Sequence, residues 1–357
     1  MCPTLTTLVL TLLLTLTLTT STTATTPFPT LPPANVTTYV VDLDAPAEEH
    51  FKAIVADHKE ELTALLAFLT KAIPPKLLPL AEKVATDLDF AFGPVVAAEL
   101  RGIADSADFE LGQIVLLNVL YELTAFCTSI LAVEPDGTLL HARNLDYSLP
   151  HDLQEVTIQV SFVRSGKPVF TATTFAGFAG VLTGMSSVLS VTVDEWNTGA
   201  AWENAFSALL EGGKAVTFVI RELLEDPTMT YADAAHTLAT EHLIAPSFLT
   251  VGGIGANQTH IITRNRLNAE NITTLETVAH TNHPFAIVIT NYPTNQPDPP
   301  SDPRRTFALH HLEAITAADL DPSSLLSVIS TPPVLNKGTV YSILACVQSQ
   351  QYITYLR

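Results

Sequence analysis

Cysteine and positive charge are both scarce in this chain. Of its 357 residues only three are cysteines, and 17 Lys and Arg residues stand against 36 Asp and Glu residues, so the net charge is −19. Nucleic-acid binding needs clustered cations, which argues against nucleic acid as a partner. The acidity fits solubility by self-repulsion, and equally an acidic compartment in which carboxylates begin to protonate.

Positive charge is also missing around Met1, where the sequence is rich in Leu and Thr. The apolar run Leu8 to Leu18 is too short to cross a bilayer but fits the core of a signal peptide. We therefore predict a signal peptide over residues 1–24, and the alternative is a Leu/Thr-rich low-complexity tail. Entry into the secretory pathway agrees with three N-glycosylation sequons, which begin at Asn35, Asn257 and Asn271.

Several well-known catalytic motifs are absent. The segment 184–188, "GMSSV", lacks the second glycine of a serine-hydrolase nucleophile elbow, and Gly253 and Gly255 lack the third glycine of a dinucleotide-binding loop. His280 and His283 have no nearby third ligand for a metal. We expect neither a metal nor a cofactor.

The pattern of apolar residues predicts an α+β fold. A short strand at 38–43 precedes a helical region at 48–100, and strand pairs follow from residue 127 onwards, with turns at "EPDG" and Ser165-Gly166. Further helices are expected at 202–226, 231–243 and 306–315. Helices before and between antiparallel hairpins favour a layered arrangement. The apolar stretch 62–84 is either a buried helical hairpin or a surface that contacts lipid.

Loss of Cys2 with the signal peptide would leave Cys127 and Cys346, which allow one disulfide at most. The ordinary fate of a free cysteine is burial as a small apolar side chain. Cys127, however, begins a strand, and the expected hairpin returns Arg143 and Asp146 to the same sheet edge. A cation near a thiol lowers its pKa, so these groups form a plausible nucleophilic site.

No histidine base is evident beside this cysteine. Scission between Phe126 and Cys127 would give the cysteine a free α-amine, whose ordinary pKa of about 8 suits a general base. A precursor that cleaves itself there would explain why a nucleophile lies so far along the chain. No disulfide is expected if Cys127 is used in this way.

The segments "FCTSI" and "ARNLDY" resemble the lysosomal acid ceramidase and N-acylethanolamine acid amidase family of N-terminal-nucleophile hydrolases. The resemblance continues in order through "TTFAGFAGVLTG", "VDEWN", "WENA", "ITRNR", "ITNY", "DPRRT" and "PVLNKGTVY". It implies an αββα four-layer sandwich with a small, mainly helical N-terminal subunit. The expected parts are residues 25–126 (the α subunit) and 127–357 (the catalytic β subunit), which remain together as a heterodimer.

The resemblance also implies roles for single residues. Cys127 would be the self-cleaving nucleophile, Arg143 would pair with its thiolate, and Asp146 would hold the α-amine. Glu195 would assist the self-cleavage or orient the site, Asn291 would donate to the oxyanion, and Arg304 would complete the charge network. The expected substrate-contacting residues are Tyr147, Leu182 and Trp202. In one departure from the family, Pro293 stands where the family usually has Asp.

The implied activity is hydrolysis of N-acyl lipid amides at acidic pH in the lysosome, with peripheral contact to a membrane or vesicle. The cysteines that bridge the ceramidase subunits are absent, whereas the ending "PVLNKGTVY" is closer to ceramidase, so both substrates stay open. Two other readings remain. One is an acylase of the choloylglycine or penicillin type with a soluble substrate, and the other is a secreted, non-catalytic lipid-binding protein.

Overall fold

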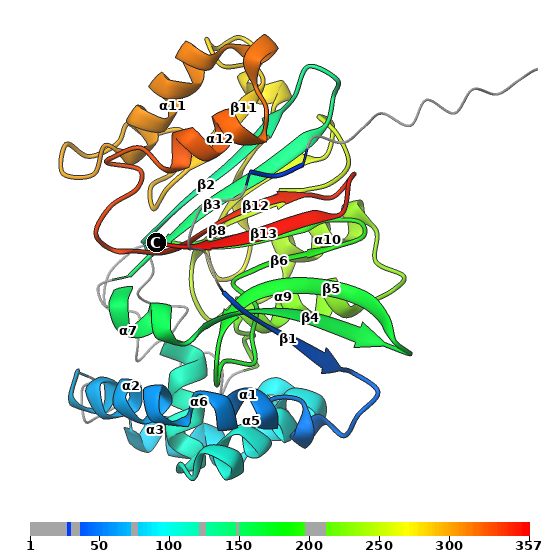
Figure 1. Cartoon of the computed structure of the whole chain (residues 1–357), viewed down its shortest axis with the longest axis vertical. Coiled ribbons are helices and arrows are strands. Elements are labelled where there is room, and N and C mark those ends of the chain that lie inside the picture. The colour runs from blue at the N-terminus through cyan, green and yellow to red at the C-terminus, as the bar shows by residue number, and fades with distance from the viewer. Residues whose placement is uncertain (1–26, 30–35, 73–77, 121–125, 148–149, 197–211) are drawn as a thin grey trace, which may run out of the picture.

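The computed structural model describes residues 27–29, 36–72, 78–120, 126–147, 150–196 and 212–357. Within these residues the strands form two sheets (Figure 1). In spatial order the eight-stranded sheet consists of β1 (Thr37–Asp42), β4 (Thr157–Arg164), β5 (Lys167–Phe175), β6 (Thr183–Ser186), β7 (Ser190–Glu195), β8 (Ser247–Gly252), β9 (Thr259–Arg264) and β10 (Ala269–Thr273). The five-stranded sheet consists of β11 (Ala286–Ile289), β2 (Phe126–Val133), β3 (Leu139–Asp146), β12 (Thr339–Cys346) and β13 (Gln351–Leu356).

Helices surround the two sheets. The N-terminal part holds α1 (Lys52–Asp57), α2 (Lys59–Ala72), α3 (Leu78–Thr86), α4 (Leu88–Phe92), α5 (Pro94–Ala107) and α6 (Leu111–Leu120). The later helices are α7 (Pro150–Glu155), α9 (Val216–Glu225), α10 (Tyr231–Thr240), α11 (Arg304–Ile315) and α12 (Pro322–Ile329), with short 3-10 turns η1 (Ala47–Glu49), η3 (Glu276–Val278) and η4 (Ala317–Asp319). No helix in the described ranges is both long and apolar enough to cross a membrane.

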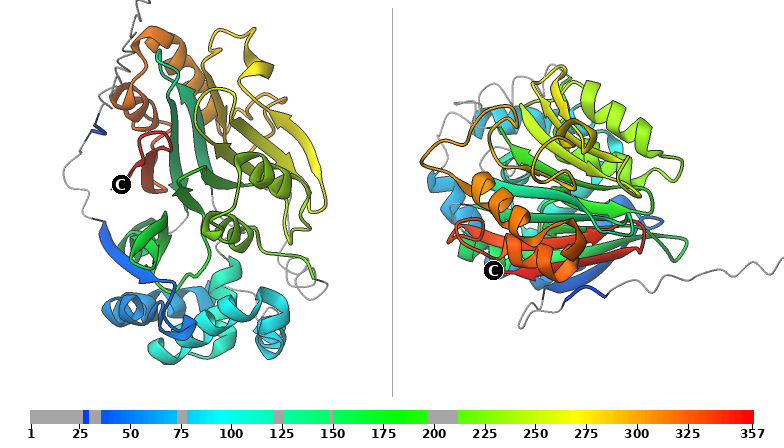
Figure 2. Two further views of the ribbon diagram at one scale, coloured as in Figure 1. Left: turned by 90° about the vertical axis from the view of Figure 1, so that its right-hand side faces the viewer. Right: turned by 90° about the horizontal axis from the view of Figure 1, so that it is seen from above.

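The sheets face each other through β2, β3, β7 and β8 (Figure 2). Helix α9 packs on β5, β6 and β7, and α10 packs on β9, so both cover the eight-stranded sheet. Helices α11 and α12 pack on β11, β3 and β12 of the other sheet. The predicted α+β class is confirmed.

Alternation along β3 explains how this strand supports a polar site inside the protein. Every residue of β3 is buried, because one face meets the other sheet and the other face meets α12. His141 and Arg143 project between the sheets, whereas Leu140 and Ala142 join the apolar cluster beneath α11 and α12. The hairpin turns expected from the sequence are present: Ser165 and Gly166 both have positive φ, of 51° and 70°, as a tight two-residue turn requires.

The helices of the N-terminal part gather at one end of the molecule, drawn blue to cyan in Figure 1. The predicted strand near its start is β1, which pairs in parallel with β4 at the edge of the eight-stranded sheet. Leu62, Leu65 and Leu66 are buried in the main core, which supports the buried-hairpin reading of that stretch over the lipid-contact reading. Phe68 is the exception, with 42% of its surface exposed.

Two helices differ from the sequence-based expectation. Of the helix expected over 202–226, residues 202–211 lie outside the described part; in the rest, α9 begins at Val216, after Gly212 and Gly213. Helix α12 was not anticipated. Its start is stabilised by a capping box in which Asp321 accepts from the backbone of Ser324 and Ser324 accepts from the backbone of Asp321, and Pro322 occupies the first turn.

Gly102 allows α5 to lie directly against η1. A Cβ at this position would come within 2.0 Å of the backbone oxygen of Glu48, so Gly102→Ala should separate the two elements. We expect the free energy of unfolding to fall by about 1–3 kcal/mol despite the better helix propensity of alanine. Gly112→Ala in α6 is the control, because its nearest neighbour is a side-chain carbon of Glu82 at 3.2 Å, which can move. Urea titration of both variants measures the difference, and equal midpoints would contradict the prediction.

Candidate active site

The hairpin of β2 and β3 brings Cys127, Arg143 and Asp146 to one end of the five-stranded sheet. In its register Phe126 lies opposite Asp146, and Ser129 lies opposite Arg143. Because side chains alternate along a strand, Cys127 and Arg143 project between the sheets, whereas Asp146 projects from the opposite face.

The thiol of Cys127 is fully buried against the guanidinium of Arg143. Nη2 of Arg143 lies 3.0 Å from Sγ and donates to the carbonyl of Val193 at 2.6 Å. Nη1 of Arg143 donates to the carbonyl of Leu182 at 2.9 Å and to the hydroxyl of Thr183. The eight-stranded sheet therefore fixes the cation beside the sulfur, and Leu182 contributes through its backbone.

Burial opposes ionisation of the Cys127 thiol in this intact chain. Burial raises the pKa of the Cys127 thiol far above its ordinary value, and the positive charge of Arg143 offsets only part of the rise. The lowered thiol pKa expected from the neighbouring cation is therefore not found in this state. Cys127 can act as a nucleophile only after its proton passes to an acceptor or its burial changes.

The backbone of Cys127 is held by Asn291 and Arg304. Its N–H donates to Oδ1 of Asn291 at 2.9 Å, and its carbonyl accepts from Nη1 of Arg304 at 2.9 Å. Nη2 of Arg304 donates to the same Oδ1 at 2.9 Å, while Nδ2 of Asn291 donates to the carbonyl of Glu195 at 2.8 Å. The side-chain amide of Asn291 thus lies beside the Phe126–Cys127 peptide bond.

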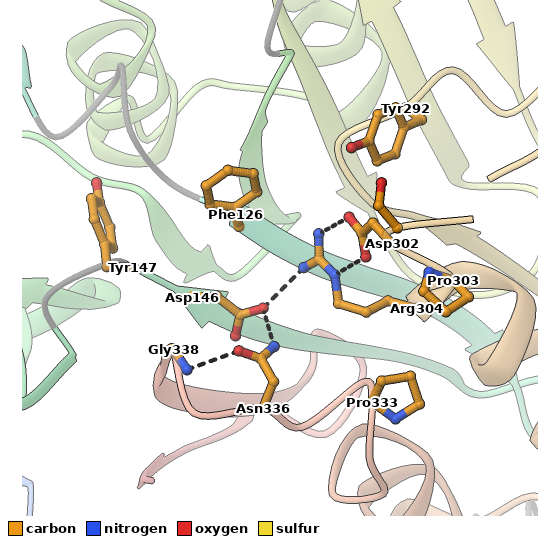
Figure 3. A pocket seen from close by; sticks show the side chains of 11 residues that line it. Phe126, Asp146, Tyr147, Tyr292, Asp302, Pro303, Arg304, Pro333, Asn336 and Gly338 are labelled. Carbon is orange, nitrogen blue, oxygen red and sulfur yellow. Dashed lines mark hydrogen bonds and ion pairs between the residues drawn. The ribbon is translucent and has the colours of Figure 1, made fainter. Parts of the chain in front are cut away.

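Arg304 links Asp146 to this site (Figure 3). It is the first residue of α11, and its guanidinium donates to Asp146 at 2.9 Å and twice to Asp302 at 2.7 Å. Asp146 also accepts from Asn336 at 2.8 Å and from Thr339 at 2.7 Å. Burial raises the pKa of Asp146, and these donors oppose the rise. The role expected of Asp146, to hold the α-amine, stays a prediction, because in the intact chain the Cys127 nitrogen is a peptide N–H, which donates to Asn291.

A cavity of about 500 Å³ opens on the Asp146 side of the sheet (Figure 3). Phe126, Tyr147 and Tyr292 supply aromatic walls, and Arg304 and Asn336 supply polar groups. The cavity therefore offers apolar surface next to hydrogen-bonding groups, a combination typical of ligand pockets. Phe126, which precedes the proposed scissile bond, is 40% exposed and forms part of its wall.

Comparison with known proteins gives consistent matches. Residues 34–92 match the family model for the beta subunit of N-acylethanolamine-hydrolyzing acid amidase. The N-acylethanolamine-hydrolyzing acid amidase of Caenorhabditis elegans is 34% identical over 85% of this chain and 87% of its own length. The acid ceramidase of Balaenoptera acutorostrata scammoni is 30% identical over 92% of this chain and 89% of its own. The chain belongs to the N-acylethanolamine acid amidase and acid ceramidase family.

A solved structure agrees with this membership of the amidase and ceramidase family. The C. elegans N-acylethanolamine-hydrolyzing acid amidase ortholog superposes with a TM-score of 0.58 and 33% identity, over 65% of this chain and all of that chain. The family model named for a beta subunit matches the segment before Phe126, for which we had used the letter α. We therefore call the two parts the N-terminal segment and the C-terminal segment.

The carboxyl group of Glu195, expected at the site of this family member, is partly buried at the end of β7. Burial raises its pKa to about 8, and among the described residues no hydrogen-bond partner of the carboxyl is found. Its backbone carbonyl, in contrast, orients Asn291. Asp194 is the carboxylate that faces Arg143, with 3.7 Å between Oδ1 and Nε. Sequence reasoning missed Asp194, although it lies in the quoted "VDEWN" segment.

The other residues singled out from the sequence are Tyr147, Trp202, the three sequon asparagines and Cys346. Tyr147 lines the cavity and packs edge-on against Phe175, whereas Trp202 and Asn35 lie outside the described residues. Of the other two sequon asparagines, Asn257 is exposed and Asn271 is partly buried. Cys127 and Cys346 are both buried and not joined in a disulfide. In the part of the chain that the structure covers, no three His, Cys, Asp or Glu side chains are grouped to hold a metal.

Proposed function

We propose that the chain is a precursor that cleaves itself before Cys127 and then hydrolyses the amide bond of N-acyl lipids, namely N-acylethanolamines or ceramide. One observation carries the proposal: the thiol of Cys127 lies 3.0 Å from a buried Arg143, and Asn291 accepts the N–H of the peptide bond that precedes Cys127, while Arg304 donates to the carbonyl of Cys127. The relatives named above are an amidase and a ceramidase of such lipids. We propose that the fold is that of an N-terminal-nucleophile hydrolase, with helices outside two stacked sheets.

The length of the solved relative supports scission at this bond. That chain, aligned over its full length, covers 65% of the present one, which is the share that residues 127–357 would form. The freed segments would stay associated, because β1 of the N-terminal segment pairs with β4 of the C-terminal segment. Loss of the covalent link to Phe126 would also open the cavity wall towards Cys127.

In the cleaved enzyme the α-amine of Cys127 takes the thiol proton, and the thiolate attacks the carbonyl carbon of the lipid amide. Asn291 donates its side-chain amide to the oxyanion, and Arg304, tied to Asp146, holds the backbone of the nucleophile. The ammonium returns its proton to the leaving nitrogen, and the amine departs as a thioester forms. Water hydrolyses the thioester and releases a fatty acid and the thiol. Glu195 contributes by orienting Asn291.

We further propose that the protein works in an acidic lysosomal compartment after the signal peptide is removed, with sugars at the sequons. Near its pI of about 4.8 the net charge vanishes, which eases approach to anionic lipid. Contact with a membrane would be peripheral, with the exposed Phe68 of α2 as a candidate contact and Tyr147, in the cavity wall, towards the substrate.

Incubation of the purified precursor at about pH 5 tests the proposal. We expect two fragments on a denaturing gel, with the larger one beginning at Cys127, followed by release of fatty acid. A panel of ceramide, palmitoylethanolamide and oleoylethanolamide then separates the two substrate classes, and a bile-acid or penicillin amide serves as the soluble comparison. An active preparation in which the Phe126–Cys127 bond is intact would refute the mechanism.

A further inference from the structure

Self-cleavage as proposed above needs a proton acceptor that the intact chain must supply without the α-amine of Cys127. Before scission the Cys127 nitrogen is a peptide amide, and its N–H donates to Asn291. An amide nitrogen is not a useful base, so the amine that would serve later turnovers cannot serve the first step. The thiol proton therefore has to pass to another group close to the sulfur.

Asp194, in the centre of the two-sheet interface, has the required position. Its side chain is fully buried, and its Oδ1 accepts from the hydroxyl of Ser129 at 3.0 Å and faces Nε of Arg143 at 3.7 Å. Among the described residues its other oxygen, Oδ2, has no hydrogen-bond partner. The sulfur of Cys127 lies 4.0 Å from the carbonyl of Val193, the residue directly before Asp194.

The charge balance of this buried space favours proton transfer within it. The guanidinium of Arg143 faces two acids there, the thiol of Cys127 and the carboxyl of Asp194. Losing the thiol proton to solvent would leave two buried anions against the same guanidinium, which is costly. Passing the proton from sulfur to Asp194 leaves the total charge unchanged. The cation then stabilises the thiolate in place of the carboxylate.

We propose that Asp194 accepts the proton of the Cys127 thiol during self-cleavage. The thiolate then forms a bond to the carbonyl carbon of Phe126. The bond between that carbon and the Cys127 nitrogen breaks, and the proton held by Asp194 returns to the departing nitrogen. The products are a thioester between Phe126 and Cys127 and a free α-amine. Water hydrolyses the thioester to the Phe126 carboxylic acid and the thiol.

The pKa of Asp194 suits this task. Burial raises it to about 6, while the charge of Arg143 and hydrogen bonds from Ser129 and Cys127 limit the rise. A base whose pKa is near the working pH combines a useful ionised fraction with sufficient basicity.

Other titratable groups nearby are less suitable. Burial raises the pKa of Glu195 to about 8, so its carboxyl is protonated under acidic conditions. Asp146 projects from the opposite face and is engaged by Arg304 and Thr339. The ring nitrogens of the buried His141 lie 2.9 Å from the Ser190 hydroxyl and 3.3 Å from the Thr192 hydroxyl. Asp194 is therefore the acceptor that the geometry favours.

The experiment compares self-cleavage rates of the full-length precursor by gel densitometry and N-terminal sequencing. Asp194→Asn keeps the size of the side chain but removes the base, and we expect scission to slow by at least about 100-fold. Asp194→Glu should restore part of the rate, because it restores a carboxylate at this position. If Asp194 had only a structural role, the longer glutamate side chain would not be expected to restore the rate. Glu134→Gln is the control, because Glu134 is a half-buried carboxyl at the far end of the same hairpin. Its precursor should cleave at the wild-type rate.

Wild-type rates in the Asp194→Asn precursor would overturn this inference while leaving the proposed function intact. Failure of the wild-type precursor to yield a chain beginning at Cys127 would instead sink the proposed function. If Asp194→Asn lacks a cooperative thermal transition, Ser129→Ala supplies the second test. It removes the hydrogen bond to Oδ1, raises the pKa of the carboxyl, and should slow scission several-fold at about pH 5. An unchanged Ser129→Ala rate would also count against Asp194.

Discussion

Replacing Cys127 by alanine is expected to abolish scission before residue 127 and to reduce lipid-amide hydrolysis by at least about 10⁴-fold. The side chain is fully buried, and Sγ is the group that Arg143 contacts at 3.0 Å. No other described cysteine lies at this end of the sheet, because Cys346 belongs to the cluster beneath α11 and α12. Gel analysis and fatty-acid release measure the two effects separately.

Cys346→Ala is the matched control for this experiment. Cys346 is equally a buried free cysteine in the five-stranded sheet, but it faces the helices and not the other sheet. Its variant should mature and turn over substrate normally, with only the modest loss of stability that a smaller core side chain brings. A Cys127→Ala protein that retained hydrolysis comparable to that of Cys346→Ala would remove Cys127 from the mechanism.

The second large effect is expected at Glu99, which joins the N-terminal segment to the C-terminal segment. Its carboxylate, on α5, accepts from Arg221 of α9 at 2.5 and 2.6 Å and lies 2.6 Å from Nδ1 of His50. Glu99 and Arg221 are each 1% exposed. Glu99→Gln removes the buried carboxylate that pairs with Arg221 and leaves that guanidinium only the more distant Glu225, at 3.7 Å, so the free energy of unfolding should fall by about 3–5 kcal/mol.

Arg101→Gln provides the comparison within the same helix. Arg101 pairs with Asp89 at 2.6 Å, but both side chains are largely exposed, so water and salt screen the pair. Denaturant titration of the intact precursor should show a clear loss for Glu99→Gln and no measurable change for Arg101→Gln. Equal midpoints for the two variants would show that the buried network does not hold the segments together.

The same network predicts how attachment of the N-terminal segment depends on pH. Burial lowers the pKa of His50, but the hydrogen bond and charge of Glu99 outweigh it, so the pKa is raised. Burial raises the pKa of Glu99, but Arg221 and His50 outweigh it, so that pKa is lowered. The His50 contribution is complete below its ordinary pKa and disappears as pH rises through the raised value. The Glu99 contribution disappears as pH falls through the lowered value.

Stability from this network is therefore greatest at mildly acidic pH, above the ordinary pKa of Glu99 and below the ordinary pKa of His50, where both contributions are complete. His50→Gln should flatten the alkaline side of the stability profile and leave the acid side in place. A wild-type profile that is flat from about pH 5 to 8 would contradict the assignment of a raised pKa to His50.

The sequence was most informative where local pattern and chemistry coincided. The β2–β3 hairpin followed from two apolar runs around Pro-Asp-Gly, and its register placed Arg143 and Asp146 near Cys127 without further information. The α+β class followed from the order of helical and strand patterns. Helix α12 was also within reach, because Asp321, Pro322 and Ser324 form a recognisable helix start.

Other parts depended on contacts between residues distant in sequence. The carboxylate at Arg143 is Asp194 and not its neighbour Glu195, because alternation along β7 turns residues 192 and 194 towards β2. Only the packing of the two sheets shows which face of β7 lies against Arg143, the face with Asp194 or the face with Glu195. Burial likewise reversed the expected direction of the shift in the Cys127 pKa. The sequence shows which charged residues are candidates to lie near the thiol, but it does not show how strongly burial opposes their effect.

The parallel pairing of β1 with β4 has a consequence for how the two pieces behave as one molecule. Residues Thr37 to Asp42 pair with Ile158 to Val163 through main-chain hydrogen bonds, which do not depend on an unbroken backbone at position 126. The C-terminal segment is thus completed by a strand, β1, whose residues belong to the N-terminal segment. A polypeptide started at Cys127 would expose the flank of β4, whereas a nicked precursor keeps that flank covered from the moment it is made.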